Sequence, residues 1–459
     1  MPTPSRPLVL PLFAVVLVAI ALAAAADGEP AAAPTSLSLK QAEETALRNQ
    51  PALLEAHGLL EAAEGRVEQA RAGYLPQVTL NGTYERTTSN FAPRPGVLPN
   101  SISTGGTSGS TLTATPTHVS WNPQYNYYLV GVTGSQLLYD FGLTSNRWRA
   151  AAASRDAAGQ NTRTAELQTL LTVRRAYFLA RAQRDLVAVA EETVKNQEKH
   201  VEQTQAFVRT GIQPDINLAT VMTALANARV QLVTARNNDA LAQAQLAQAM
   251  GVTVGPAFAL ADAELPAVSG EDGPTGALLD RAERARPELA NLVDQKHAQE
   301  LTVRSIKGAY GPALSAIANL SDNGTSLDGL VPNWYVGLGL TWNILQGGLT
   351  NGQVREATGT LANLVGQERA ERLQIQVDVE QARLGVQGAK ATIGAAEEAQ
   401  ANARNQLTLA EQRYAHGLGN AVELSDAQVA YTSAEAQLVQ ARFNLASARA
   451  QLLTAVGDR

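Results

Sequence analysis

Hydrophobic positions along most of the chain recur with a helical period. Between residues 424 and 452 a large apolar or aromatic side chain returns every seven residues, with an alanine three positions after each. Large residues alternating with alanine are typical of the seam of a closely packed coiled coil. The spacing recurs on both sides of Gly211 and Gly417. The sequence therefore predicts two antiparallel helical hairpins, over 143–250 and 349–456, each with a glycine turn at its tip.

The predicted helices are long enough to form an extended structure. The first long helix runs over about 67 residues, 143–209, and a helix of that length measures about 100 Å. Two shorter predicted helices, 51–72 and 217–250, nearly match it when they are stacked end to end. We therefore expect a rod in which each long helix is flanked by two short ones.

Between the helical blocks the hydrophobic period changes to two, which predicts strands at about 77–86, 126–139, 313–320 and 334–342. The last of these alternates most cleanly, with apolar side chains facing one way at Trp334, Val336, Leu338, Leu340 and Trp342. A soluble sheet packed on the rod is one interpretation. Strands of nine or ten residues with one apolar face and terminal aromatics also fit an outer-membrane β-barrel.

A barrel interpretation has a consequence for assembly. Four strands cannot close a barrel, and lipid does not tolerate an open sheet edge. If these strands lie in a membrane, several copies of the chain must share one barrel.

The chain contains two internal repeats. Residues 51–76 match 287–312 at a constant offset of 236, and 142–251 match 348–457 at an offset of 206. We assign the first repeat to 37–251 and the second to 277–457, joined by a linker rich in Pro and Gly at 252–276. The 30-residue difference between the offsets falls in the Ser-, Thr- and Gly-rich stretch 86–124, which is expected to be a long exposed loop.

The N-terminus predicts export. An apolar run follows Arg6 and ends at small residues, so residues 1–26 are interpreted as a Sec-type signal peptide, with an uncleaved membrane anchor as the alternative. No other apolar run approaches the length of a membrane-spanning helix. The chain contains no cysteine, which excludes disulfides, thiolate metal sites and an acylated N-terminal cysteine.

Charge and motifs exclude several classes of function. A formal net charge of −6 offers no basic field for nucleic acid. The five histidines are scattered without metal-ligand spacing, and no nucleophile or phosphate-binding motif is present. We therefore expect no enzyme, no cofactor and no metal site.

Three stretches together carry a resemblance to a known family. They are "AGYLP" at 72–76, "LLYDFG" at 137–142 and "RYAHGLGNAVELSDAQ" at 413–428. In their order and duplication they resemble the TolC family of outer-membrane efflux proteins, in its non-acylated branch because the chain lacks cysteine. Two departures are Gln346, which stands where the first repeat has Asp140, and Asn217, where some members carry an acid.

The resemblance implies an α+β membrane protein that forms a homotrimer. Each protomer would give four strands to a twelve-stranded transmembrane β-barrel, continued by a long periplasmic tunnel of antiparallel α-helical coiled coils. It also implies a location in the outer membrane of a Gram-negative bacterium, in contact with its lipid. The partners would be a periplasmic adaptor and an inner-membrane transporter, in a tripartite efflux or type I secretion system. A porin-like component without a dedicated pump and a periplasmic coiled-coil adaptor or scaffold are the alternatives.

The resemblance also assigns roles to the hairpin tips. It implies that Glu423 and Asp426 line the channel constriction, where carboxylates converging on a threefold axis would select cations. A competing interpretation is that Asn420 and Glu423 form a helix-capping box. The tip residues Gly211, Ile212, Gly417 and Leu418 are candidates for docking an adaptor.

Overall fold

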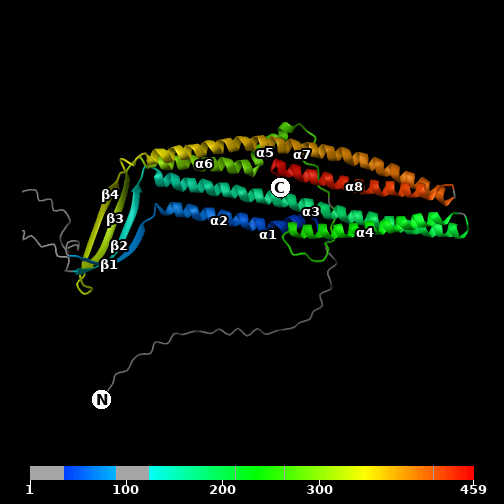
Figure 1. Ribbon diagram of the computed structural model, residues 1–459. Helices are drawn as coiled ribbons and strands as arrows, with labels where there is room; N and C mark the ends of the chain where they lie inside the picture. The colour runs from blue at the N-terminus through cyan, green and yellow to red at the C-terminus, as the bar shows by residue number, and fades with distance from the viewer. Residues whose placement is uncertain (1–35, 89–123, 212, 263, 417) are drawn as a thin grey trace, which may run out of the picture.

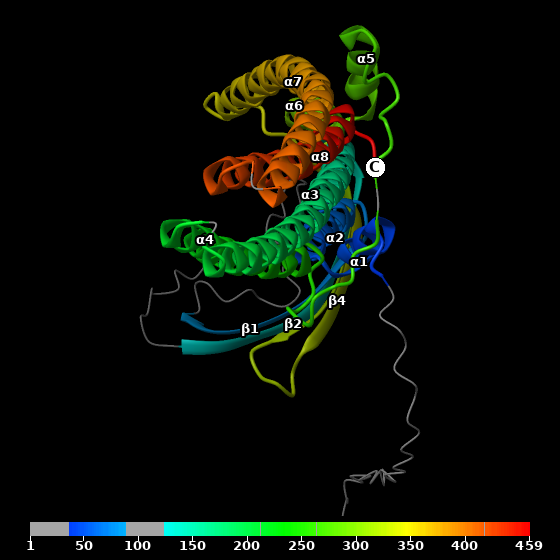
Figure 2. The same ribbon diagram turned by 90° about the vertical axis from the view of Figure 1, so that its right-hand side faces the viewer.

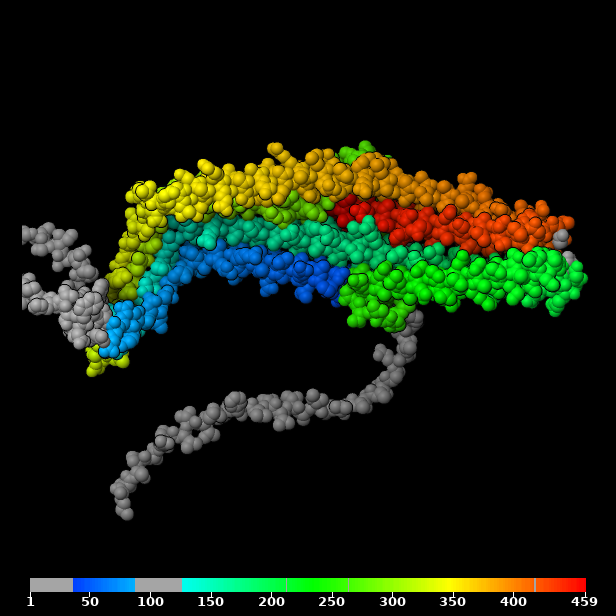
Figure 3. All heavy atoms as spheres, in the orientation of Figure 1, coloured from blue at the N-terminus to red at the C-terminus, as the bar shows by residue number. Residues whose placement is uncertain are grey.

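The protein is a helical rod with a sheet at one end (Figures 1 and 3). The computed structural model describes residues 36–88, 124–211, 213–262, 264–416 and 418–459. The expected signal peptide 1–26, most of the 86–124 loop, Ile212 and Gly417 lie outside the described residues.

The elements alternate between short helices, strand pairs and helical hairpins. In chain order they are α1 (Leu39–Asn49), α2 (Pro51–Ala72), β1 (Gln77–Thr88), β2 (Gln124–Tyr139), α3 (Leu143–Arg209), α4 (Asp215–Ala249), α5 (Thr275–Ala285), α6 (Pro287–Gly308), β3 (Ala313–Gly324), β4 (Val331–Thr341), α7 (Leu349–Ala415) and α8 (Ala421–Val456). Helices α3 and α7 each have 67 residues, and α2 and α6 each have 22.

Two prolines set where α2 and α6 begin. Pro51 and Pro287 each occupy the first turn of a helix, and the residues before them, Gln50 and Arg286, are extended with ψ of 121°. A residue that precedes proline avoids the helical conformation, so α1 and α5 end there. Helices α1 and α5 did not appear in the sequence prediction, and α5 includes the last two residues of the predicted 252–276 linker.

The helices form one curved layer. Helices α2 and α4 lie end to end along one side of α3, while α6 and α8 lie end to end along the other side and separate α3 from α7 (Figures 1 and 2). One edge of the layer is therefore α7, and the other is formed by α2 and α4. The stacking of short helices along a long one is the arrangement that the sequence predicts.

The apolar core is divided along the rod. The largest cluster lies in the middle, where α1, α3, α4 and α8 meet the linker, and includes Val173, Tyr177, Leu246 and Met250. A second cluster joins α5, α7 and α8, and a smaller one lies near the tips. The alanines that the sequence places in the seam of the second hairpin are largely buried: Ala427, Ala434, Ala441 and Ala455.

The sheet has the strand order β1-β2-β3-β4, and every pairing is antiparallel. The register places one set of apolar side chains on a single face, exposed by 40% to 77%: Val78, Leu80, Tyr84, Val130, Val132, Leu320, Trp334, Val336, Leu338 and Leu340. The other face is mostly polar, with Leu129, Leu137 and Ile317 as exceptions, and Asn319 Nδ2 donates to Thr133 Oγ1 at 2.9 Å across it. Trp342, predicted within the last strand, lies one residue beyond its end, and its indole N–H donates to the Tyr310 carbonyl.

Candidate functional site

The two hairpin tips lie side by side at the end of the rod away from the sheet (Figures 1 and 3). At the first tip α3 ends at Arg209, and Gly211 has a φ of +74°, the left-handed conformation that glycine adopts without strain. At the second tip Leu418 is 76% exposed, and its N–H donates to the Arg413 carbonyl. The structure thus presents Gly211 and Leu418 at the surface of the tips.

The side chain of Glu423 does not make the contact that a capping box requires. Its backbone N–H donates to Asn420 Oδ1 at 2.7 Å, so Asn420 does cap α8. Among the described residues, however, the Glu423 carboxylate makes no return bond to the Asn420 N–H; it lies 3.3 Å from Arg413 Nε instead. The capping box is therefore only half formed, because the ion pair across the turn takes the carboxylate.

Asp426 lies one turn further along α8 and is exposed. It makes no ion pair with any described residue. Its neighbours one turn away, Val422 and Val429, are also exposed. Asp426 therefore belongs to a surface of α8 that this chain leaves uncovered, whereas the carboxylate of Glu423 already has a partner.

A buried tyrosine joins the tips of the two hairpins. Tyr414 of α7 is 1% exposed, and its hydroxyl lies 2.7 Å from Thr204 Oγ1 of α3 and donates to Gln213 Oε1 at 3.2 Å. Its ring packs edge-on against Phe207. The sequence marks Tyr414 as a seam residue by its heptad position, but the pattern does not identify its partners in the other hairpin.

Near the tips, a set of polar side chains also contributes to the contact between the hairpins, beside the small apolar cluster. We call this set the polar seam: Thr193, Gln197, His200 and Thr204 of α3, Tyr414 of α7, and Gln428 and Thr432 of α8. Thr193 and Thr432 place their hydroxyls 3.2 Å apart, and Gln197, His200, Thr204 and Gln428 are all buried. Sequence reasoning missed this seam, although the polar residues on α3 have spacings of four, three and four.

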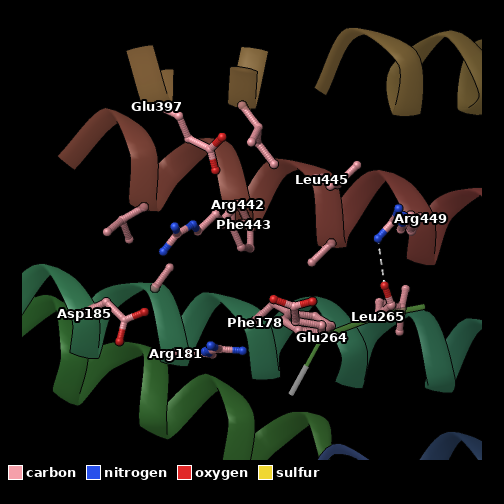
Figure 4. A pocket seen from close by; sticks show the side chains of 14 residues that line it. Phe178, Arg181, Asp185, Glu264, Leu265, Glu397, Arg442, Phe443, Leu445 and Arg449 are labelled. Carbon is pink, nitrogen blue, oxygen red and sulfur yellow. Dashed lines mark hydrogen bonds between the residues drawn. The ribbon is translucent and has the colours of Figure 1, made fainter. Parts of the chain in front are cut away.

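Between the polar seam and the middle core the hairpins are separated by a hollow of about 380 Å³ (Figure 4). Phe178, Arg181 and Asp185 of α3 face Arg442, Phe443 and Arg449 of α8 across it, and Glu264 and Leu265 of the linker form part of the wall. Arg449 Nη1 donates to the Leu265 carbonyl at 2.9 Å. The linker is thus fastened to α8 at the border of the hollow.

A buried carboxylate strengthens that attachment. The Glu271 side chain is 2% exposed and accepts hydrogen bonds from Lys390 Nζ at 2.7 Å and Arg449 Nη2 at 3.0 Å. Burial alone would raise the pKa of Glu271, but the bonds from Lys390, Arg449 and the Val268 N–H outweigh it and lower the pKa. This ion cluster joins the linker to both α7 and α8.

Two features are absent from the described residues. No three His, Asp or Glu side chains in this part of the chain gather in a way that could hold a metal ion. Among the same residues, no helix combines the length and apolarity that crossing a membrane requires.

Comparison with known proteins identifies relatives along the whole rod and sheet. The sequence profile of the family described as outer membrane efflux protein matches residues 43–252 and 278–458. Outer membrane protein TolC of Escherichia coli K12 is 25% identical over 448 residues, covering 92% of this chain and 82% of that protein. The toluene efflux pump outer membrane protein TtgC of Pseudomonas putida is 24% identical, covering 92% of this chain and 83% of TtgC.

A solved structure shares the fold. The Campylobacter jejuni CmeC outer membrane channel superposes with a TM-score of 0.76 at 17% identity, over 91% of this chain and 85% of CmeC. The helical rod and its four-stranded sheet are therefore the architecture of one chain of such a channel.

Proposed function

This chain belongs to the outer membrane efflux protein family, and on that premise we propose that three copies of it assemble into one continuous duct. The protein lies in the Gram-negative outer membrane and is an exit duct for efflux. The proposal concerns how the duct is built, where it narrows and what it meets at its lower end.

The one-sided sheet is the observation that carries the proposal. Its apolar face is exposed, its opposite face is mostly polar, and both outer strands, β1 and β4, have an unpaired edge within the described residues. Lipid requires every backbone group to be paired, so the edges must be closed by other strands. Three four-stranded sheets make a twelve-stranded barrel with apolar residues outward and polar residues toward the lumen.

The edges of the helical layer support the same assembly. On α7 the side chains Leu373, Val377 and Leu384 are exposed and lie along one face of the helix. On the opposite edge, Leu54 of α2 and Val230 of α4 are also exposed. When β4 of one copy pairs with β1 of the next, these apolar edges meet and become buried.

At the tip, three copies bring the uncovered surfaces of α8 toward one axis. We assign the constriction to Asp426, with Glu423 beside it in its ion pair with Arg413. The exposed tip residues Gly211 and Leu418, with Ile212 and Gly417, are proposed to dock a periplasmic adaptor. Through that adaptor the duct would receive substrate from an inner-membrane transporter.

The assembly is tested by lysine substitutions on opposite faces of β4. Val336→Lys places a charge on the apolar face, which in a barrel costs about 2–4 kcal/mol per copy at mid-membrane. We expect it to abolish the three-chain particle in outer-membrane extracts, measured by cross-linking and native mass. The matched variant Tyr335→Lys lies on the polar face and should assemble while shifting ion selectivity toward anions. Equal assembly of both variants, or a particle with another number of chains, would overturn the proposal.

A further inference from the structure

His200 is buried in the polar seam. It is 7% exposed, and neither of its ring nitrogens makes a hydrogen bond of normal geometry to a described residue, although the exposed side chain of Gln203 lies close enough to act on its pKa. A buried polar group without a partner carries a free-energy cost, so its position calls for an explanation.

The histidine borders the place where the two hairpins meet. Its side chain lines a cavity of about 10 Å³, at the lower limit of the space that one water molecule needs. Thr220, Val221 and Ala224 of α4 and Ala421, Leu424 and Ser425 of α8 form the other walls together with Gln197. The cavity therefore touches the first turns of α8, which also carry Glu423 and Asp426.

The charges near His200 come from only two of the four helices around it. Lys199 lies on α3 and Glu411 on α7, while the cavity-lining residues of α4 and α8 are uncharged. Burial lowers the pKa of His200; Gln203 and Glu411 oppose this shift, and Lys199 adds to it. The surroundings thus accept a neutral imidazole and disfavour an imidazolium.

We propose that the polar seam is a proton-sensitive joint, in which protonation of His200 releases the first turns of α8 from α3 and α4. A charged ring in this small, mostly uncharged cavity gains hydration only if the walls separate. The polar contacts of the seam are side-chain hydrogen bonds, which can exchange for bonds to water at little cost. Opening also exposes part of the small apolar cluster that contains Val221 and Leu424, which opposes the separation. We also expect acid to widen the channel opening at the tip, and this expectation rests on the proposed duct.

The direction of the effect follows from linkage. Because the pKa of His200 is lowered in the closed seam, the neutral ring stabilises that state above pH 6.5, the ordinary value for histidine. This stability is lost as the pH falls below 6.5. Each unit by which the two states differ in pKa corresponds to a tenfold change in the opening equilibrium.

Hydrogen exchange of the full chain in detergent tests the joint directly. Rates for residues 421–432, normalised to the intrinsic rate, are compared at pH 7.5 and 5.5. We expect the acid sample to open up to about tenfold more. His200→Gln, which stays neutral, should remove the difference. His416→Gln, which alters an exposed histidine at the same tip, should keep it. The inference is wrong if the wild type shows no acid effect or if His200→Gln retains it.

A second variant keeps the test independent of how well His200→Gln folds. The chain has no cysteine, so Thr193→Cys with Thr432→Cys introduces a single pair across the seam, where the native hydroxyls lie 3.2 Å apart. Oxidation should suppress the acid-induced exchange, and reduction should restore it. Undiminished exchange in the oxidised variant would contradict the joint.

The proposed duct is tested separately in planar bilayers. Conductance that rises between pH 7.5 and 5.5, and does so less in His200→Gln, connects the joint to the aperture. If the seam opens by hydrogen exchange while conductance stays constant, the joint stands and the assignment of the constriction to this tip fails.

Discussion

The middle of the rod and its tip each enclose a buried tyrosine, but the two are held by different kinds of partner. The hydroxyl of Tyr177 in the middle lies 2.7 Å from the Ala261 carbonyl and 3.0 Å from the Leu37 carbonyl. The hydroxyl of Tyr414 at the tip meets the side chains of Thr204 and Gln213. Backbone carbonyls in packed segments cannot turn away, whereas side chains can change rotamer.

The surroundings extend this contrast. Tyr177 lies in the largest apolar cluster of the chain, beside an ion cluster centred on Glu271. Tyr414 lies in a smaller cluster that gives way to the polar seam. The difference indicates that the two hairpins are held together more firmly in the middle of the rod than at the tips.

Tyr177→Ala should be the most damaging change, because it opens a cavity in the main core and removes the bonds that hold the linker. We expect a loss of about 3–5 kcal/mol in the free energy of unfolding, measured by thermal or denaturant unfolding in detergent. Tyr177→Phe keeps the ring and should lose only about 1 kcal/mol. Equal losses of unfolding free energy in the two variants would show that packing of the Tyr177 ring does not stabilise the middle of the rod.

Glu271→Ala should come next, since it leaves Lys390 and Arg449 without their buried partner. Breaking a buried ion pair costs up to about 3–5 kcal/mol, and partial exposure of the two cations should reduce this to about 2–3 kcal/mol. Protease sensitivity of the linker is the measurement. Substitution of the neighbouring exposed Asp272 by Ala is the control and should have little effect.

The same cluster predicts how the two regions differ in acid. Since the pKa of Glu271 is lowered below its ordinary 4.5, its contribution to stability is present above pH 4.5 and is lost as the pH falls through the folded value. The contribution of neutral His200 begins to be lost as the pH falls through 6.5. Between pH 6.5 and pH 4.5, hydrogen exchange should increase at the tip and stay unchanged in the middle of the rod. An increase in both regions at the same pH would contradict this difference.

Tyr414→Phe should have a smaller and local effect. It removes a hydroxyl that joins the two hairpins, at a cost of about 1 kcal/mol, which corresponds to roughly fivefold faster local opening. Exchange should increase over residues 411–416 while the unfolding midpoint hardly moves. Tyr177→Phe is the matched control in the middle, and there the exchange at the tip should not change.

Neutralising Glu423 and Asp426 together should have the smallest effect on stability. The Glu423–Arg413 pair is largely exposed, so its loss should cost less than about 0.5 kcal/mol. Cation selectivity in planar bilayers should nevertheless fall if these carboxylates line the constriction. Asp215→Asn, which removes one negative charge at the first tip, is the control. Unchanged selectivity in the double variant would remove the constriction assignment.

Much of the fold can be predicted from local patterns in the sequence. The heptad of large residues and alanine predicts α7 and α8, and alternation predicts the apolar face of β4. Helix α1 could also have been predicted, because Ser38 and Gln41 form a capping box that is readable as S-x-x-Q.

The candidate site was predictable only in part, for a physical reason. Glu423, Asp426, Gly211 and Leu418 can be placed at the tips because each lies next to a predicted turn. The contacts of Tyr414 with Thr204, and of Glu271 with Lys390 and Arg449, join residues more than a hundred positions apart. The first contact depends on how the two hairpins are rotated against each other, and the other two depend on where the linker lies against the second hairpin. A periodic pattern within one helix specifies neither.

The unpaired edges of β1 and β4 also have a consequence for the life of a newly made chain. The helices can bury their apolar seams within one copy, but in the proposed assembly the sheet completes its hydrogen bonding only with other copies. Folding of this end is then a reaction between molecules, with a rate that rises with their concentration. A cell that makes too few copies would contain chains with unpaired strand edges. These edges can pair with strands of other proteins, and the chains would be exposed to degradation. Expression level thus becomes part of the folding mechanism.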